Sequence, residues 1–395
     1  MSCNEWKELT LEDIGDIVGG GTPSTKNENY YGDEISWITP KDLSGYTSKY
    51  ISKGERSITK LGLEKSSAKL LPKGTVLFSS RAPIGYVAIA ENELTTNQGF
   101  KSIICNPKIA NNEFIYYRMK LAKYELESIA GGSTFKEVSG KVMKEFKISL
   151  PPLGEQEKIA NILSSLDDKI ELNNEMNKTL EEMAQSIFKR WFVDFEFPNE
   201  DGEPYKSSGG EMVDSELGMI PKGWEVGTLD NLGVFKNGKG INQDLRNDNG
   251  KNLIYGSNGI IGKTDEVLQK DNCIIIGRVG AYCGSIQLSL EPCWVTDNAI
   301  MGTAKQRKYL PYLHRFLLNY PLRESAGGSA QPLINQSILK SILTVMPPNE
   351  LFDKYYDISK EIIYKIDDNN KENIMLSEIR DSLLPKLMSG EISVN

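Results

Sequence analysis

The sequence predicts an α+β protein with two sheet-rich α/β domains in a pseudo-twofold arrangement, joined by two long helices that form an antiparallel coiled coil. Three observations lead to this prediction. The chain repeats itself, each copy ends in a Pro-Pro pair followed by a long helical pattern, and both helical patterns carry apolar residues and asparagines at matching positions. In an antiparallel pair related by a twofold axis the midpoints of the helices meet, so matching asparagines there can face each other.

The repeat is visible in two sets of matching residues. Trp6, Thr10, Leu11, Gly15 and Gly20 recur 218 residues later as Trp224, Thr228, Leu229, Gly233 and Gly238. The motif Ala130–Ser133 recurs 196 residues later as Ala326–Ser329. The second copy has therefore lost residues between these anchors, nearly all of them before the arginines Arg81 and Arg278. A repeat of this length indicates a duplicated domain with its connector, not a solenoid.

Composition excludes several protein classes. The chain has 395 residues, of which 39% are hydrophobic and 25% charged, as in ordinary globular proteins. Its five cysteines form no C-x-x-C pair, which argues against a disulfide framework and against a cysteine-rich zinc site. No signal-like start and no run of 18 apolar residues occurs, so we expect a cytoplasmic protein without a membrane partner.

Charge is unevenly distributed. The net charge of −8 argues against nucleic-acid binding, yet residues 41–81 hold nine Lys or Arg against three Asp or Glu. Residues 155–182 hold the opposite excess, eight acidic against three basic. The first region is suited to face phosphate and the second is not. Both are equally explained as solvated faces of an ordinary protein.

The first domain is expected at residues 1–150. Short β-type runs occur at 35–38, 75–78 and 85–90, and one helical segment occurs at 112–126. The second domain, expected at 224–346, repeats this plan with strands at 272–276 and 284–290 and a helix at 309–319. Residues 196–223 lie between them and are rich in Gly, Ser, Glu and Asp, which predicts a linker.

A central helix is expected at 151–195. The Pro-Pro pair ends the preceding strand, and acidic residues follow it in the first helical turn. Steps of four and three predict a coiled-coil seam that consists of Ile159, Leu163, Leu166, Ile170, Asn173, Asn177, Leu180, Ala184 and Ile187.

A distal helix is expected at 347–395, with Asn349 as its N-cap. The corresponding seam consists of Tyr355, Ser359, Ile362, Ile366, Asn369, Asn373, Leu376, Arg380 and Leu383. We expect Asn173 and Asn177 to meet Asn369 and Asn373 and to fix the register. The alternative is a hydrated, poorly packed stretch.

Nothing in the sequence resembles an active site. The single histidine, His314, rules out a two-histidine metal site and lies in an apolar helical stretch, where a structural role is expected. Gly262-Lys263-Thr264 lacks the first glycine that a phosphate-binding loop requires. A two-carboxylate site stays open, but we predict no catalytic residue, no metal and no cofactor on this chain.

Both copies offer clusters suited to binding DNA. Arginine can contact guanine, and asparagine or glutamine can contact adenine, while Gly-Gly-Ser turns offer backbone amides to phosphate. The predicted DNA-binding residues of the first copy are Thr22, Lys41, Ser80, Arg81, Asn97, Gln98, Ser133 and Thr134, and those of the second are Lys239, Ser257, Asn258, Arg278, Asn298 and Ser329. The alternative is that these turns only shape the domain.

Five motifs in order carry a family resemblance. They are Gly20-Gly-Thr-Pro-Ser24, Arg81-Ala-Pro-Ile-Gly85, Thr96-Asn-Gln-Gly-Phe100, Pro151-Pro-Leu-Gly-Glu-Gln156 with Lys158-Ile-Ala160, and Leu383-Leu-Pro-Lys-Leu-Met-Ser-Gly-Glu-Ile392. In this order they resemble the specificity subunits of type I restriction–modification systems. The second copy departs from the pattern, because Gly238-Lys-Gly-Ile241 stands where the Thr-Pro motif is expected.

The resemblance implies a division of labour. Residues 1–150 and 224–346 would be two target-recognition domains, each reading one half of a bipartite site in double-stranded DNA. The helices at 151–195 and 347–395 would set the spacing and dock two modification subunits, which methylate adenine with S-adenosylmethionine. Restriction subunits would use ATP and Mg to translocate and cleave. A helix over 155–192 spans roughly 55 Å at about 1.5 Å per residue, so inserting one turn in each helix should lengthen the unread spacer.

Two other functions are compatible with the sequence. One is a standalone DNA methyltransferase or nuclease that would need a cofactor or metal site not visible here. The other is a coiled-coil scaffold that docks proteins and does not bind DNA.

Overall fold

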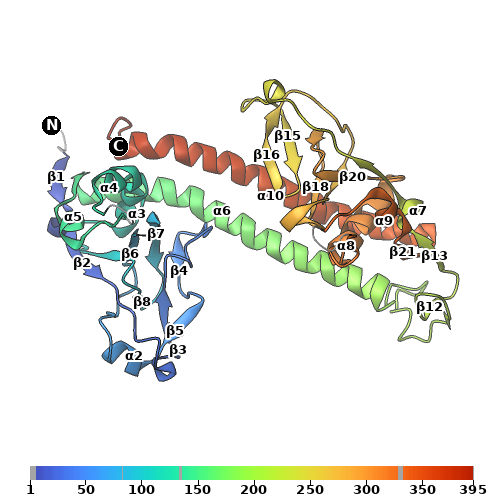
Figure 1. Ribbon diagram of the computed structural model, residues 1–395, viewed down its shortest axis with the longest axis horizontal. Helices are drawn as coiled ribbons and strands as arrows, with labels where there is room; N and C mark the ends of the chain where they lie inside the picture. The colour runs from blue at the N-terminus through green and yellow to red at the C-terminus, as the bar shows by residue number, and fades with distance from the viewer. Residues whose placement is uncertain (1–5, 82, 133–135, 328–331, 395) are drawn as a thin grey trace. The chain divides into compact units, whose positions relative to one another are not determined.

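The computed structural model describes residues 6–394 except 82, 133–135 and 328–331. Contacts divide the chain into two units, unit 1 with Met1–Asn174 and Lys371–Asn395, and unit 2 with Glu175–Asn370. Each unit holds one sheet-rich domain and one half of each long helix (Figure 1). This division differs from the predicted one, which separated the helices at 151–195 and 347–395 from the domains. The helix halves bury apolar side chains in the domain cores, so they belong to them.

Unit 1 is built on three sheets. The largest has the order β2(Gly15–Gly19), β9(Lys101–Cys105), β6(Val76–Ser80), β7(Ile84–Ala90) and β4(Tyr50–Ile51). A second has the order β5(Arg56–Ile58), β3(Tyr31–Ile38) and β8(Thr95–Thr96), and β1(Lys7–Thr10) pairs with β10(Lys147–Leu150). The strand pairs are antiparallel except β4 with β7 and β3 with β8, which are parallel. The three strands predicted for this domain are confirmed.

The helices of unit 1 are short. They are α1(Leu11–Ile14), α2(Lys60–Glu64), α3(Asn112–Leu121), α4(Lys123–Ile129) and α5(Gly140–Glu145), with a 3₁₀ turn at Glu28–Tyr30. The single helix expected at 112–126 is two helices that meet at Ala122. In unit 1, α3 and α4 lie beside the long helix, whereas α2 lies with β3 and β5 at the far end of the domain (Figure 1).

Unit 2 repeats this plan in shorter form. One sheet has the order β14(Gly233–Asn237), β20(Ala299–Ala304), β17(Cys273–Gly277) and β18(Ile286–Ser289). Another has the order β16(Gly259–Thr264), β15(Asn252–Gly256) and β19(Cys293–Val295), and β13(Glu225–Thr228) pairs with β21(Leu343–Met346). The helices are α7(Leu229–Leu232), α8(Leu310–Asn319) and α9(Gln336–Ser341), with 3₁₀ turns at Gln243–Leu245, Gly280–Tyr282 and Arg307–Tyr309.

The segment predicted as a linker, 196–223, is folded. Strand β11(Met212–Val213) pairs with β12(Ile220–Pro221). The ring of Phe197 stacks on Tyr205 at 4.6 Å and on Trp224 at 5.1 Å between centroids. Phe197, Ile220 and Trp224 are buried in the core of unit 2. The apolar area that these side chains remove from water stabilises a fixed conformation, which the polar composition of the segment does not reveal.

Two long helices follow the Pro-Pro pairs. Helix α6 spans Leu153–Phe188 and continues as a π-helical turn over Lys189–Val193, and α10 spans Asn349–Met388. Asn349 is the first residue of α10 and not a flanking cap. The buried side chain of Gln156 accepts from Asn111 N at 2.8 Å and donates to Pro151 O at 2.8 Å, which fixes the start of α6 on the domain.

The helices pair antiparallel in each unit. In unit 1, Asn173 Nδ2 donates to Asn373 Oδ1 at 2.9 Å, and Arg380 binds Asp167 at 2.6 Å. In unit 2, Asn369 Nδ2 donates to Asn177 Oδ1 at 2.8 Å. Asn173 and Asn369 are 0% and 1% exposed, so the alternative of a hydrated stretch is wrong. The predicted antiparallel pairing is confirmed, and every predicted seam residue is buried or half-buried.

Candidate nucleic-acid interface

Four segments of unit 1 are joined by backbone hydrogen bonds. Gly21 N donates to Thr96 O at 2.9 Å, which links the glycine-rich turn to the loop after β8. Ser80 N donates to Gly99 O at 2.7 Å, and Val138 N donates to Ser80 O at 2.9 Å. The motifs around 20–22, 80–81, 96–99 and 136–138 therefore form one cluster, although they are far apart in the sequence.

The glycine-rich turn and the loop at 96–97 approach each other most closely at Gly20. A Cβ atom on Gly20 would lie 2.0 Å from Asn97 O and 2.4 Å from Thr96 Oγ1. Since real Cβ contacts do not come this close, only glycine lets the two loops pack together. The hydroxyl of Thr22 donates to the Gln98 side chain in the same place.

Arg81 lies at the edge of the cluster. Its Nη1 is 3.6 Å from Glu137 Oε2, and Lys101 Nζ is 3.4 Å from Glu137 Oε1. The Arg81 side chain is 36% exposed, so its guanidinium can reach a ligand outside the protein. A half-exposed arginine on fixed backbone is suited to contact phosphate or guanine.

Several predicted residues of unit 1 have other roles or positions. Ser80 is completely buried and its hydroxyl donates to Gly99 O at 3.1 Å, so its side chain supports the loop and does not face a ligand. Asn97 Oδ1 accepts from Gly99 N at 2.8 Å within the turn. Lys41 is exposed, outside the hydrogen-bonded cluster, and paired with Glu55 at 2.6 Å. Ser133 and Thr134 lie outside the described residues.

Unit 2 has a corresponding cluster. Lys239 N donates to Val295 O at 2.9 Å, Arg278 N donates to Asn298 O at 3.0 Å, and Ile334 N donates to Arg278 O at 3.0 Å. A Cβ atom on Gly238 would lie 2.2 Å from Thr296 O. This close approach matches that of Gly20 to Asn97 O in unit 1. The same backbone plan is thus built twice with different side chains.

The predicted side chains of unit 2 are mostly accessible. Lys239, Asn258 and Asn298 are exposed. Ser257 is half-buried, and its carbonyl accepts from Ser285 Oγ at 2.5 Å. Arg278 is half-buried, and its Nε has no hydrogen-bond partner in the described part of the chain. Ser329 lies outside the described residues.

The basic segment of unit 1 is largely solvent-facing. Seven of its nine cations are exposed, namely Lys41, Lys53, Arg56, Lys60, Lys65, Lys69 and Lys73. Arg56 stacks over Tyr31 at 4.1 Å from the ring centroid, which leaves a charged and aromatic surface on β3 and β5. Of the other two, Arg81 is half-buried, and Lys49 is buried and paired with Glu113 at 3.3 Å and Asp168 at 3.1 Å.

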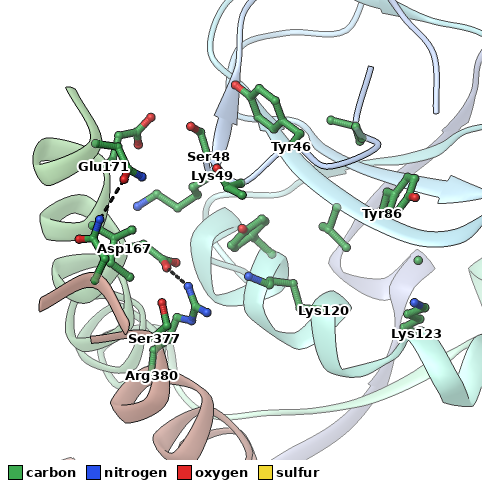
Figure 2. A pocket seen from close by; sticks show the side chains of 18 residues that line it. Tyr46, Ser48, Lys49, Tyr86, Lys120, Lys123, Asp167, Glu171, Ser377 and Arg380 are labelled. Carbon is green, nitrogen blue, oxygen red and sulfur yellow. Dashed lines mark hydrogen bonds and ion pairs between the residues drawn. The ribbon is translucent and has the colours of Figure 1, made fainter. Parts of the chain in front are cut away.

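Lys49 belongs to a cavity of about 540 Å³ in unit 1, between the domain and its helix halves (Figure 2). Tyr117 donates to Asp167 at 2.6 Å, and Arg380 binds the same carboxylate. Burial, together with the nearby Asp167 carboxylate, raises the pKa of Tyr117, so the phenol stays protonated. These polar contacts anchor the domain on α6 and α10. Sequence reasoning missed them because the partners are separated by up to 213 positions.

Neither a metal-ligating group nor a histidine base is found in the described part of the chain. No group of three or more His, Cys, Asp or Glu among the described residues is arranged to hold a metal ion. Burial lowers the pKa of His314 to about 3, so its ring is neutral and unsuited to act as a base at neutral pH. Within the described ranges, no helix has the length and apolarity that crossing a membrane requires.

Comparison with known proteins decides the family. Residues 4–182 and 221–376 match the model described as "Type I restriction modification DNA specificity domain". The chain belongs to the type I specificity subunits. The specificity subunit of the type I restriction enzyme MjaIX of Methanocaldococcus jannaschii is 37% identical over 418 residues, with 99% of this chain and 94% of that protein covered.

Two further type I specificity subunits are similar to this chain over nearly its full length. The HindI specificity subunit of Haemophilus influenzae is 25% identical over 482 residues, with 98% of this chain and 100% of that protein covered. The crystal structure of a type I S subunit from M. genitalium superimposes with a TM-score of 0.68 at 20% identity, with 98% and 97% of the two chains covered. That likeness confirms the fold.

Membership of the type I specificity subunits defines the general role. The chain is a DNA sequence-specificity subunit, and it acts with other subunits of a type I restriction–modification complex and with DNA. The family consists of recognition subunits, so the prediction that the chain is not itself the enzyme is confirmed. A standalone methyltransferase or nuclease and a scaffold without DNA are not supported.

Proposed function

We propose that each unit reads one half of a bipartite target in double-stranded DNA through its own loop cluster. The observation that carries this proposal is the recurrence of one backbone plan with different side chains. The hydrogen bonds from Ser80 N to Gly99 O and from Arg278 N to Asn298 O match Arg278 with Ser80 and Asn298 with Gly99, whereas unit 1 has Arg81 and Gln98 one position away. A shared frame with divergent donors and acceptors is what two different half-sites require, because base edges are distinguished by their hydrogen-bond patterns.

We also propose that unit 1 contacts the phosphate backbone of the DNA. The exposed cations of residues 41–73 would neutralise phosphates beside the half-site read by unit 1. Acidic residues are concentrated on α6, as in the run Asp167, Asp168 and Glu171. This charge disfavours contact between α6 and phosphate. The helices are instead proposed to separate the units and to dock partners.

The proposed partners are two modification subunits and, in the complete system, restriction subunits. Adenine methylation would use S-adenosylmethionine, and translocation and cleavage would use ATP and Mg, all bound by those partners and not by this chain. Their proposed docking surface is the pair of helices whose seam residues hold α6 and α10 together.

Methylation mapping tests the proposal. A host lacking other adenine methyltransferases would express this chain together with its neighbouring modification subunit, and long-read sequencing would record modified adenines. We expect one motif with two specified halves and an unspecified spacer. An otherwise identical host with the modification subunit alone is the control.

Two outcomes would contradict parts of this proposal. A continuous methylated motif would show that the units do not read separate halves. An intact purified complex that methylates no motif would contradict the recognition role proposed for the loop clusters.

A further inference from the structure

One arginine of the two loop clusters is paired with a carboxylate, and the other is not. In unit 1, Glu137 lies 3.6 Å from Arg81 and 3.4 Å from Lys101. In the described part of unit 2, no ion pair to Arg278 is found, and its Nε lacks a hydrogen-bond partner. The two arginines do not hold matching positions, because Val279 bridges Leu333 in unit 2 as Arg81 bridges Glu137 in unit 1.

The backbone fixes which residue corresponds to Glu137. Glu137 N donates to Gly131 O at 2.9 Å, and Gly131 N donates to Glu137 O at 3.1 Å. In unit 2, Leu333 N donates to Gly327 O at 3.0 Å, and Gly327 N donates to Leu333 O at 3.1 Å. Leu333 therefore occupies the position of Glu137, and it offers no charge.

The second cation also lacks a counterpart. Lys101 pairs with Gly19 on β2, and Ile300 pairs with Asn237 at the matching point of β14 and β20. The Lys101 side chain is 15% exposed, so water screens its contact with Glu137 less than it screens a surface pair. Unit 1 alone thus combines two cations with one carboxylate between them.

We propose that Glu137 competes with DNA phosphate for Arg81 and Lys101 and so weakens binding of unit 1 to DNA that lacks the target. The inference rests on the proposed recognition role of the loop cluster. Binding to any duplex requires a phosphate to approach the cations while the carboxylate repels it. At the target, base contacts offset this repulsion, whereas at other sequences nothing offsets it. Glu137 is therefore a specificity-determining residue that need not touch a base.

The proposal also predicts how unit 2 binds DNA. Val279 and Leu333 stand in unit 2 where Arg81 and Glu137 stand in unit 1, so neither residue repels phosphate there and we expect unit 2 to contribute more of the sequence-independent affinity. A carboxylate added at Leu333, which is 37% exposed, should repel phosphate at the matching place of unit 2. The two units would then differ in how strictly each depends on its bases.

Glu137→Gln is the central test, in the full chain assembled with its modification subunits. Fluorescence anisotropy would follow binding to a scrambled duplex and to the duplex identified by methylation mapping, over a range of salt concentrations. We expect E137Q to bind the scrambled duplex about three- to tenfold more tightly at low salt, with a steeper salt dependence by about one phosphate contact. Binding to the target duplex should change less, so the ratio of the two affinities falls.

Matched variants assign the effect to Glu137. Glu8→Gln removes the same charge from the exposed ion pair with Lys147 and should leave both affinities within twofold. In an Arg81→Gln background the gain from E137Q should shrink, because one of the two released cations is missing. Leu333→Glu should weaken binding to the scrambled duplex.

Failure of the proposed function and failure of the competition by Glu137 give different results. If the wild-type complex binds neither duplex, the proposed function and this inference both fail. If it prefers the target but E137Q leaves binding to the scrambled duplex unchanged or weaker, only the competition by Glu137 is wrong. Thermal unfolding of each variant confirms that the change in affinity is not a loss of folded protein.

Discussion

At the residue scale, Gly20 and Gly238 let the loops of the two clusters pack closely. Gly20→Ala would place a methyl group 2.0 Å from Asn97 O, and the backbone would have to shift to relieve the clash. We expect a destabilisation of about 1–3 kcal/mol, since overpacking against backbone is not relieved by rotation of a side chain. Hydrogen exchange should show faster exchange of the Gly21 amide, which donates to Thr96 O.

A neighbouring glycine supplies the control. Gly19 has nothing within 4 Å of an added Cβ, so Gly19→Ala should change neither stability nor exchange by a comparable amount. Gly238→Ala should repeat the effect in unit 2, because its Cβ would meet Thr296 O at 2.2 Å. Equal behaviour of G19A and G20A would contradict the close-approach argument.

His314 makes the stability of unit 2 depend on pH. Burial lowers the pKa of its ring from 6.5 to about 3, with a further decrease from the adjacent Arg315 charge. Below pH 6.5 the unfolded chain takes up a proton that the folded chain does not, so stability falls as pH decreases from 6.5 towards 3. The slope for this one group is about 1.4 kcal/mol per pH unit.

A neutral replacement isolates this contribution. In urea unfolding at several pH values, His314→Gln should remove that slope between pH 6.5 and 5 while other groups still titrate. His314 Nδ1 has no hydrogen-bond partner in the described part of the chain, so no strong polar contact is lost by the substitution. An unchanged pH profile would show that the ring has the same pKa in the folded and the unfolded chain.

The sequence identified loops that lie together in the structure, but it did not indicate which of their side chains are buried. The motifs around Gly20, Arg81 and Asn97 were expected to bind, and the structure brings them together. Ser80 and Lys49 stand in equally polar or basic stretches, yet both are buried. Burial depends on partners such as Asp168, 119 positions away from Lys49, and no local pattern encodes that contact.

At the scale of elements, the asparagines in the helix seam set the register. Asn173 Nδ2 donates to Glu372 Oε2 at 2.8 Å and to Asn373 Oδ1 at 2.9 Å, while Asn173 itself is completely buried. Asn173→Ala would leave both acceptors without this donor. We expect a loss of about 1–3 kcal/mol in the stability of unit 1, measured by urea unfolding.

The exposed neighbour Glu175 gives a matched comparison. Glu175→Ala on the same helix should change stability by less than about 0.5 kcal/mol. Joint replacement of Asn173 and Asn373 by leucine should recover stability, since an apolar pair needs no hydrogen bonds, while weakening the preference for one register. A leucine pair less stable than N173A alone would contradict this account of the seam.

Periodicity explains why the helices were predictable and the segment 196–223 was not. In α6 and α10, steps of three and four select one face, so the buried side chains can be read from spacing alone. In 196–223, Phe197 and Tyr205 are separated by polar and glycine residues, and they form a stack with Trp224, which follows the segment. Aperiodic apolar residues do not indicate where they meet, so the polar composition was mistaken for a linker.

For the whole molecule, the duplication separates what is kept from what varies. Both units keep the pairing of first and last strands, the close-approach glycine and the helix halves. Unit 1 alone has α2 and β4 among the described elements, and both lie within the basic segment. The length difference therefore falls on the surface proposed to face phosphate, whereas the frame that carries the helices is preserved.

The continuous helices give the spacer prediction its sharpest form. One heptad inserted after Asn174 in α6 and one after Asn370 in α10 would fall between the two units and preserve the seam period. Each helix gains about 10 Å, at roughly 1.5 Å per residue, which corresponds to about three base pairs. Methylation mapping should then find both half-sites unchanged and the spacer longer by about that number. A seven-residue insertion after Gly209, where no atom lies within 4 Å of an added Cβ, should leave the motif as it was. An unchanged spacer in an active complex with lengthened helices would show that the helices do not set the distance between the half-sites.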